Sequence, residues 1–383
     1  MIADSLQAWR LRGTPDRLLV GALVVIALLG LVMVASASTA VAARQTGDAL
    51  HYFYRQSFYL ALGIAFGGAV FMVPMRTWAA RPFVLLALGI GLLIVVLLPG
   101  VGHSVNGARR WIDLGLISIQ ASEPARLLLI LYLAGYAARR RRSLVETWGG
   151  LLRPLVFVVL AGGLLLLEPN FGALVVLGAI AGLMFFVAGA RLLHLLVVGA
   201  VGASAMAAIM VSSPYRLERI ISFVHPWANA QDTGFQLTQS LMAIGHGKLF
   251  GVGLGNSVQK LMYLPETHTD FLFAVYADEF GLLGTLALLG LYLIVVWRGF
   301  AIARRALDSG AWFAGFAAYG LVSWLGVQAF INIGVNMGLL PTKGLTLPLM
   351  SYGGSSLITV CAVCALIFRI DVETQSGTSE ASS

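Results

Sequence analysis

The sequence predicts an all-α, polytopic membrane protein with about ten transmembrane helices and one large extracytoplasmic loop. Hydrophobic residues make up 59% of the 383 residues and charged residues only 11%, and the mean hydropathy is +0.88. Soluble domains carry about 25% charged residues, so the composition excludes a soluble enzyme, a disordered chain and a collagen-like fibre. The second observation is a series of apolar runs, each close to the length that crosses a bilayer. In lipid the backbone must satisfy its hydrogen bonds within each run, which predicts helices.

The predicted spans follow one another along the chain at 18–40, 56–73, 83–101, 124–138, 152–168, 171–190, 192–211, 271–297, 312–340 and 347–369. The first span ends in small residues, as a signal peptide does, but its apolar stretch is longer than a signal peptide needs. We therefore expect a retained helix. The fourth span is short and begins at a polar edge. Cys361 and Cys364 lie inside the last span, where they are expected to be small packing residues.

Basic residues orient these spans, because cytoplasmic loops of membrane proteins are rich in lysine and arginine. An N-terminus inside the cell places most of the 25 basic residues in the cytoplasm, including the run of arginines at 139–142. The prediction is a cytoplasmic segment 1–17, a membrane domain 18–369 and a disordered cytoplasmic tail 370–383. The loop 212–270 is then extracytoplasmic, and its stretches 216–223 and 235–245 are typical of short amphipathic helices at a membrane surface.

Two pairs of arginines lie on the predicted outer side, against this trend. Arg109 and Arg110 stand beside Trp111, and Arg216 and Arg219 are three residues apart on one predicted helical face. Guanidinium groups bind phosphate bidentately, so both pairs are candidates to bind the diphosphate of a lipid headgroup. For the first pair the alternative is interface anchoring with an ion pair to Asp113 or Glu123. For the second pair the alternative is simple snorkelling.

A polar cluster precedes the eighth span, and its candidate substrate-binding residues are Lys260, Glu266, His268 and Thr269. Asp270 ends this cluster at the boundary of the span. Partial desolvation there would raise the pKa of its carboxyl group and suit a general base. The alternative is an N-cap of the helix that follows. The acidic groups could also bind a divalent cation, Mg or Mn. Glu279 is expected to pair inside the bundle instead of acting with Asp270.

The segment 332–356 contains two prolines and several glycines, which break the helix between the last two spans. Non-helical backbone at membrane depth must be buried in protein or line a cavity. Lys343 is the one charged residue of this segment, and it either meets a phosphate or snorkels. Ser351 is a further candidate for substrate contact.

Several motifs together resemble the SEDS family of bacterial shape, elongation, division and sporulation proteins, over residues 18–369. They are RRWIDLG, QASEPARL, EPNFGA, YRLERI, FQLTQSLMAIGHG, YLPETHTDFLFAV and PTKGLTLPLMSYGGSS. The form PTKGLTLP is similar to the division branch of the family. The resemblance implies a ten-helix polymerase that joins lipid II into peptidoglycan strands at the division septum of the bacterial inner membrane. It further implies that Asp270 is catalytic, and it matches Lys343 and the Arg109–Trp111 motif to conserved family positions.

The sequence also departs from the family pattern, at Ala121, Arg126, Asn170, Met262 and Asp278. These departures leave the main site intact, but they put in doubt any role for an acid at position 170 or 262.

The expected reaction is an inverting glycosyl transfer with undecaprenyl diphosphate as the leaving group. The alternatives are a lipid II flippase and a division scaffold without activity of its own. The partners implied by the resemblance are lipid II, the nascent lipid-linked glycan strand, a class B penicillin-binding protein and other division proteins. The net charge of +8 is explained by the cytoplasmic anchors, so no nucleic-acid partner is expected.

Overall fold

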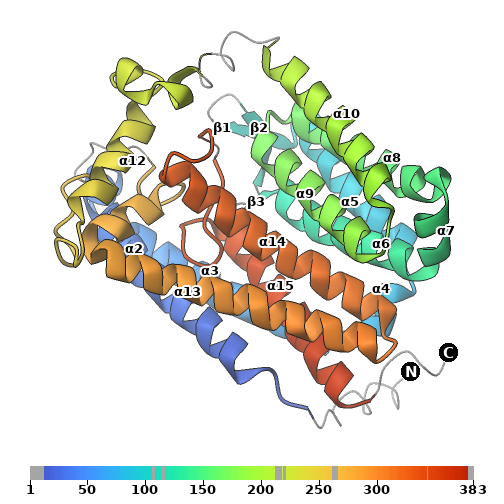
Figure 1. The fold of residues 1–383 in the computed structure, drawn as a ribbon. Coiled ribbons are helices and arrows are strands. Elements are labelled where there is room, and N and C mark those ends of the chain that lie inside the picture. Colours follow the sequence, from blue (N-terminus) through green and yellow to red (C-terminus); the bar gives the residue numbers. More distant parts are fainter. Residues whose placement is uncertain are drawn as a thin grey trace.

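The computed structural model describes residues 13–105, 108–113, 115, 117–211, 218, 221–260, 266–342 and 344–377. Ten long helices form the bundle in this part of the chain, and Figure 1 shows their arrangement. They are α2 (Arg17–Thr46), α3 (His51–Met72), α5 (Pro82–Leu97), α6 (Ser122–Arg139), α8 (Trp148–Leu167), α9 (Phe171–Val187), α10 (Leu192–Val211), α13 (Leu272–Asp308), α14 (Trp312–Asn336) and α15 (Gly354–Gln375). Each corresponds to one predicted span, so the predicted helical bundle is confirmed.

Length and composition qualify six of the described helices as membrane spans, namely α2, α8, α10, α13, α14 and α15, while α5 and α9 are shorter apolar helices. The remaining two, α3 and α6, carry more polar side chains. Several predicted boundaries are wrong by more than a turn, and two of them differ most. Helix α13 runs on to Asp308 instead of ending at 297, and α15 begins at Gly354 instead of 347. The late start of α15 follows from the proline- and glycine-rich segment before it, which cannot continue a helix.

Helices α14 and α15 lie at the centre of the bundle, where most of their side chains are buried. The packing of α15 against α3 depends on small residues. A Cβ atom built on Gly63 would lie 2.9 Å from Cys361 Sγ, and one on Gly67 would lie 3.0 Å from the carbonyl oxygen of Cys361. Small residues let membrane helices approach this closely. Both cysteines are free, and the predicted packing role is confirmed for Cys361.

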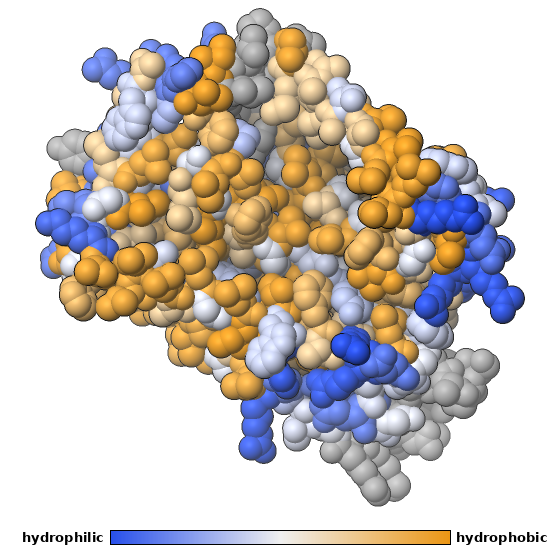
Figure 2. All heavy atoms as spheres, viewed as in Figure 1, coloured by the Kyte–Doolittle hydropathy of each residue, from blue (hydrophilic) through white to orange (hydrophobic). Residues whose placement is uncertain are grey.

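Helix α10 lies at the edge of the bundle, and His194 is its only buried residue among those described. Leucine and valine side chains cover the rest of its surface, for example Leu193 and Val201, which are 67% and 65% exposed. Figure 2 shows that hydrophobic side chains cover much of the face in view, whereas hydrophilic side chains gather toward its edges. This distribution is that of a protein surrounded by lipid.

A small antiparallel sheet, which the sequence did not predict, lies between α5 and α6. Its strands β1 (Gly102–Val105), β2 (Ala108–Asp113) and β3 (Ser118–Gln120) follow in the order β1-β2-β3. Trp111 on β2 is paired with His103 on one side and Gln120 on the other. Because the strands satisfy one another's backbone groups, this segment keeps a regular structure outside the helices.

Helix α13 is interrupted at Gly281, whose φ of +66° and ψ of −164° are not helical. The loop after α12 (Phe235–His246) approaches the backbone here, and a Cβ on Gly281 would lie 2.3 Å from the nitrogen of Gly251. The amide groups of Val252 and Gly253 donate to the carbonyls of Asp278 and Glu279, at 3.0 and 3.1 Å. Helix α12 confirms the predicted element at 235–245. The other predicted amphipathic stretch, 216–223, lies largely outside the described residues.

We call the end of the bundle that carries the sheet, the α8–α9 turn and the start of α13 the site end. The opposite end, where α6 and α13 finish, is the arginine end. The first and last described segments meet at the arginine end, since the amide of Asp16 donates to Asp371 Oδ2 at 2.9 Å. Helix α15 continues to Gln375, and Arg369 donates to Glu373 at 2.5 Å. Residues 370–375, predicted to belong to a disordered tail, are therefore helical.

Candidate active site

The connections at the site end converge on Asp270, which lies just before α13. Its backbone carbonyl accepts hydrogen bonds from Asn332 Nδ2 at 2.9 Å and from Asn336 Nδ2 at 3.0 Å. Asp270 is not the N-cap of α13, because that position is Phe271 and no side chain caps the helix. The carboxylate is therefore free for other chemistry, while the backbone is fixed by α14.

The carboxyl group of Asp270 is surrounded by groups that shift its affinity for a proton. Burial and the negative charge of Glu266 raise the pKa of Asp270 to about 7, against the lowering effect of Arg110. A Cβ on Gly344 would lie 3.0 Å from Asp270 Oδ2, so the segment before α15 approaches the carboxylate closely. A carboxyl group with a pKa near the working pH is suited to general-base catalysis.

Strand β2 places Arg110 close enough to interact with this carboxylate, whereas Arg109 is exposed. The register of β1 and β2 shifts at this point, because His103 pairs with Trp111 and Ser104 with Arg109, which leaves Arg110 as the extra residue of β2. Arg110 interacts electrostatically with Asp270 and Glu168, although burial lowers its own pKa. Its Nε atom is buried without a hydrogen-bond partner among the described residues. The two arginines therefore do not form the adjacent pair that the sequence predicted.

Neither arginine forms the ion pair that was the alternative. Asp113 Oδ1 accepts from the amide of Gly115 at 2.9 Å, and Glu123 pairs with Arg126 at 3.5 Å.

A second buried carboxyl group belongs to Glu168, in the turn between α8 and α9. The side chain of Glu168 is 0% exposed, and neither of its oxygens has a hydrogen-bond partner among the described residues. Burial raises the pKa of Glu168 to about 8, and the positive charge of Arg110 opposes this rise. Arg110 thus interacts with two carboxyl groups whose proton affinities are both increased.

Residues 345–351, in the segment between α14 and α15, are mostly buried in protein, as predicted for non-helical backbone in a membrane domain. Side chains of the surrounding helices satisfy its carbonyl groups. Asn332 donates to Leu345 at 2.6 Å, Gln328 to Thr346 at 2.9 Å, Tyr292 to Pro348 at 2.7 Å and Gln56 to Ser351 at 3.2 Å. Helices α3, α13 and α14 therefore hold this segment beside Asp270.

The sequence matches the family of cell cycle proteins FtsW, RodA and SpoVE over residues 16–376. The chain belongs to this family. It is the SEDS family that the motifs resembled.

Curated relatives and solved structures resemble this chain over more than nine tenths of its length. The probable peptidoglycan glycosyltransferase FtsW of Nitrosococcus halophilus is 51% identical over 94% of this chain and 93% of its own. The probable peptidoglycan glycosyltransferase FtsW of Coxiella burnetii is 49% identical over 91% of this chain and 94% of its own. A solved chain from a peptidoglycan synthase complex that coordinates polymerization and crosslinking has a TM-score of 0.78 at 30% identity, covering 94% of this chain and 98% of its own.

The rod shape determining protein RodA of Thermus thermophilus has a TM-score of 0.70 at 31% identity, with 94% and 97% covered. The identity to FtsW proteins is higher, in agreement with the predicted division branch.

Several of the predicted site residues lie together in the FtsW/RodA/SpoVE fold. Thr269 Oγ1 donates to Glu266 Oε2 at 2.6 Å, which orients that carboxylate next to Asp270. The ring of His268 lies 4.4 Å from that of Tyr52, and burial lowers the pKa of His268. The carbonyl of His268 accepts from the amide of Tyr352 at 2.8 Å. The predicted cluster around Asp270 is therefore one compact unit with the segment before α15.

Lys260 and Ser351, predicted to bind substrate, are both engaged in the protein. Lys260 Nζ lies 3.0 Å from Glu279 Oε1 and donates to Ser36 Oγ at 3.0 Å. The predicted pairing of Glu279 inside the bundle is confirmed, and Lys260 is its partner. Ser351 Oγ accepts from the amide of Leu347 at 2.9 Å and is buried. Both side chains thus supply the partner that a buried carboxylate and a buried amide each require, and their contact with substrate stays a prediction.

Arg216, Arg219 and Lys343 lie outside the described residues, so their predicted contacts with substrate stay predictions. The predicted binding of a divalent cation also stays a prediction. Among the described residues, no three histidine, cysteine, aspartate or glutamate side chains are arranged to hold a metal ion. The reaction proposed for this protein is written with side chains alone.

Sequence reasoning missed three residues that build this site: Asn332, Asn336 and Glu168. Gln328, Asn332 and Asn336 are spaced four residues apart, so they share one face of α14. Three side-chain amides at this spacing in an apolar helix predict that one face of the helix is polar. Glu168 was visible as an acid beside a tight turn, but its burial depends on packing that the sequence does not show.

Proposed function

We propose that this protein is a peptidoglycan glycosyltransferase that polymerises lipid II into glycan strands during cell division. Its identity to FtsW glycosyltransferases over nearly the whole chain supports the activity. The observation that carries the mechanism is the environment of Asp270. Its backbone is fixed by α14, its carboxyl group interacts with Arg110, and the pKa of that group is about 7.

In the proposed reaction, Asp270 accepts the proton from the 4-hydroxyl of the acceptor sugar. The hydroxyl oxygen attacks the anomeric carbon of the donor and forms the new glycosidic bond. The bond between that carbon and the diphosphate breaks, with inversion, and undecaprenyl diphosphate leaves with the bonding electron pair. A positioned base typically contributes about 10²–10⁴-fold to such a step.

Arg110 is the described cation best placed to stabilise the departing diphosphate. Its Nε has no partner among the described residues, and it already lies in the field of two carboxyl groups. Charge develops on the leaving group in the transition state, where a preorganised guanidinium is most effective. Arg216, Arg219 and Lys343 are further candidates for the same diphosphate.

The proposed setting is the inner membrane at the division septum, with the site end outside the cell and both termini in the cytoplasm. The meeting of the two described chain ends at the arginine end supports this orientation. The proposed partner is a class B penicillin-binding protein, since a structural relative belongs to a complex that coordinates polymerization and crosslinking.

Asp270→Asn tests the proposal, because it keeps the shape of the side chain and removes the base. We expect the purified variant, with its partner, to polymerise lipid II about 10²–10⁴-fold more slowly. Wild-type polymerisation by this variant would refute the role of Asp270. Transfer of labelled lipid II across the membrane of vesicles, without polymer formation, would support the flippase alternative. Growth of cells that carry only the Asp270→Asn variant would support the scaffold alternative, because a scaffold needs no base.

A further inference from the structure

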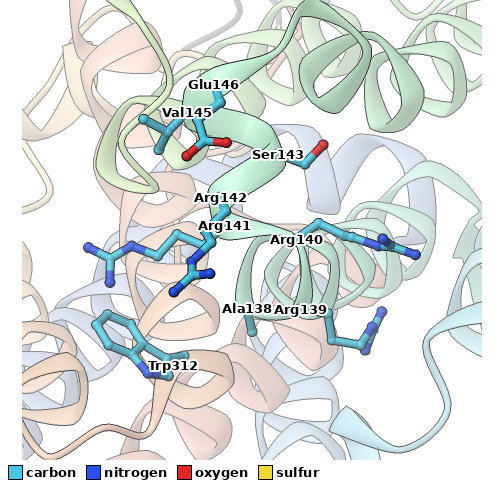
Figure 3. A pocket seen from close by; sticks show the side chains of 9 residues that line it. All are labelled: Ala138, Arg139, Arg140, Arg141, Arg142, Ser143, Val145, Glu146 and Trp312. Atoms are coloured by element: carbon cyan, nitrogen blue, oxygen red, sulfur yellow. The ribbon is translucent and has the colours of Figure 1, made fainter.

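At the arginine end, far from Asp270, four consecutive arginines surround a cavity of about 660 Å³. Arg139 ends α6, Arg140 follows it, and Arg141 and Arg142 begin α7 (Arg141–Glu146). Trp312, the first residue of α14, forms the opposite wall (Figure 3). The guanidinium of Arg141 lies 4.3 Å from the centre of the Trp312 ring. Three helices, α6, α7 and α14, therefore build this cavity, rather than one charged loop.

The charge of this cavity is not compensated. None of the four arginines forms an ion pair with a described residue, and Glu146 is the only acidic residue among the lining side chains. Four other arginines at this end are each matched with a carboxylate. Arg298 pairs with Asp16, Arg304 with Asp308, Arg305 with Asp371 and Arg369 with Glu373. Simple anchoring at the membrane surface does not require arginines to gather around a hollow.

The cavity lies next to a lipid-facing surface. Val145, which lines it, packs against Gly189 after the end of α9. The rings of Trp148 and His194 lie 3.8 Å apart and join the start of α8 to α10. Beside them Phe186 and Leu192 are 58% and 60% exposed. A ligand with a phosphate in the cavity could thus extend acyl chains along α9 and α10.

We propose that this cavity binds the phosphate of an anionic membrane lipid. Guanidinium groups bind phosphate oxygens bidentately, and basic pockets between helices on the cytoplasmic side of membrane proteins bind anionic headgroups. Trp312 holds Arg141 in place by stacking, so its guanidinium meets the phosphate with little loss of freedom. This site is independent of the proposed glycosyl transfer.

Native mass spectrometry of the purified full-length protein tests the proposal, with phosphatidylglycerol and phosphatidylcholine of identical acyl chains as probes. We expect preferential binding of phosphatidylglycerol by the wild type. The double variant Arg141→Gln/Arg142→Gln should weaken that binding by about fivefold for each arginine removed. The matched control is Arg304→Gln, which removes an exposed arginine from the same end but outside the cavity, and it should leave the preference unchanged.

Equal binding of the two lipids, or an equal loss in the control, would overturn the proposal. Full competition by inorganic pyrophosphate, at a concentration similar to that of phosphatidylglycerol, would also overturn it. The natural ligand of the cavity would then be a soluble phosphate compound and not a lipid. Melting temperatures of the variants verify that each is folded. The exposed positions of Arg141 and Arg142 make such folding expected.

Discussion

Asn332 donates hydrogen bonds from one nitrogen to the carbonyls of Asp270 and Leu345, at 2.9 and 2.6 Å. A single buried amide on α14 thus joins the residue before α13 to the segment before α15. These two segments are far apart in the sequence and carry different parts of the proposed site.

Asn332→Ala should slow polymerisation, because the carbonyl of Leu345 loses its donor and the carbonyl of Asp270 keeps only Asn336, so Asp270 is held less firmly. An unsatisfied buried polar group costs about 1–3 kcal/mol, so we also expect a lower melting temperature. The measurement is the rate of lipid II polymerisation at a temperature where the variant is fully folded. An unchanged kcat there would show that the amide supports the fold alone.

The rate of polymerisation should rise with pH and reach half of its plateau near pH 7, where Asp270 loses its proton. Arg110 lowers the pKa of Asp270. Arg110→Gln should therefore move this limb of the pH–rate profile to higher pH, in addition to lowering kcat. Arg109→Gln is the matched control, since Arg109 is exposed and is not among the charges that shift the pKa of Asp270, and it should leave the limb in place. A limb that stays fixed in Arg110→Gln would contradict the arrangement.

Glu168→Gln should stabilise the protein increasingly as the pH rises from about 4.5 to about 8. Burial raises the pKa of Glu168 from 4.5 to about 8, so the folded state holds the proton more tightly than the unfolded state. The wild-type protein therefore has the full contribution of protonated Glu168 to its free energy of unfolding below pH 4.5, and it loses this contribution as the pH rises through 8. Glutamine keeps the neutral form at every pH. Melting temperatures across this range provide the measurement.

Glu146→Gln, an exposed glutamate of α7, is the control for that series. A difference between Glu168→Gln and wild type that does not change with pH would argue against a buried, protonated Glu168.

Lys260→Met should destabilise the protein by about 3–5 kcal/mol, because it leaves the carboxylate of Glu279 buried without its cation. The double variant Lys260→Met/Glu279→Gln should recover most of this loss, since both charges are then removed. Thermal unfolding in detergent measures both effects. If Lys260 acted instead on the substrate, Lys260→Met would keep its melting temperature and raise KM.

The apolar runs predicted the helical bundle, because composition and length decide which segments can lie in lipid. They could not predict where α13 ends or where α15 begins, since these boundaries depend on packing against neighbours. The sheet at 102–120 was missed for a similar reason. Its strands are short, and only their pairing makes them regular.

The site was predictable in its chemistry but not in its geometry. Asp270 was identified from its place at the start of an apolar helix and from the family motif. Arg109 and Arg110 looked equivalent in the sequence, and only the strand conformation separates them. Lys260 looked free to bind substrate, because its partner Glu279 becomes a neighbour only when the loop after α12 meets α13.

The register shift in β2 has a consequence for how this protein can vary. Substitution of Arg109 alters only an exposed position, whereas insertion or deletion of one residue between β1 and Arg110 would change which residue is the extra one of the strand. Arg110 would then leave the position from which it interacts with Asp270. Length in residues 102–110 should therefore be under stricter selection than the identity of most side chains there.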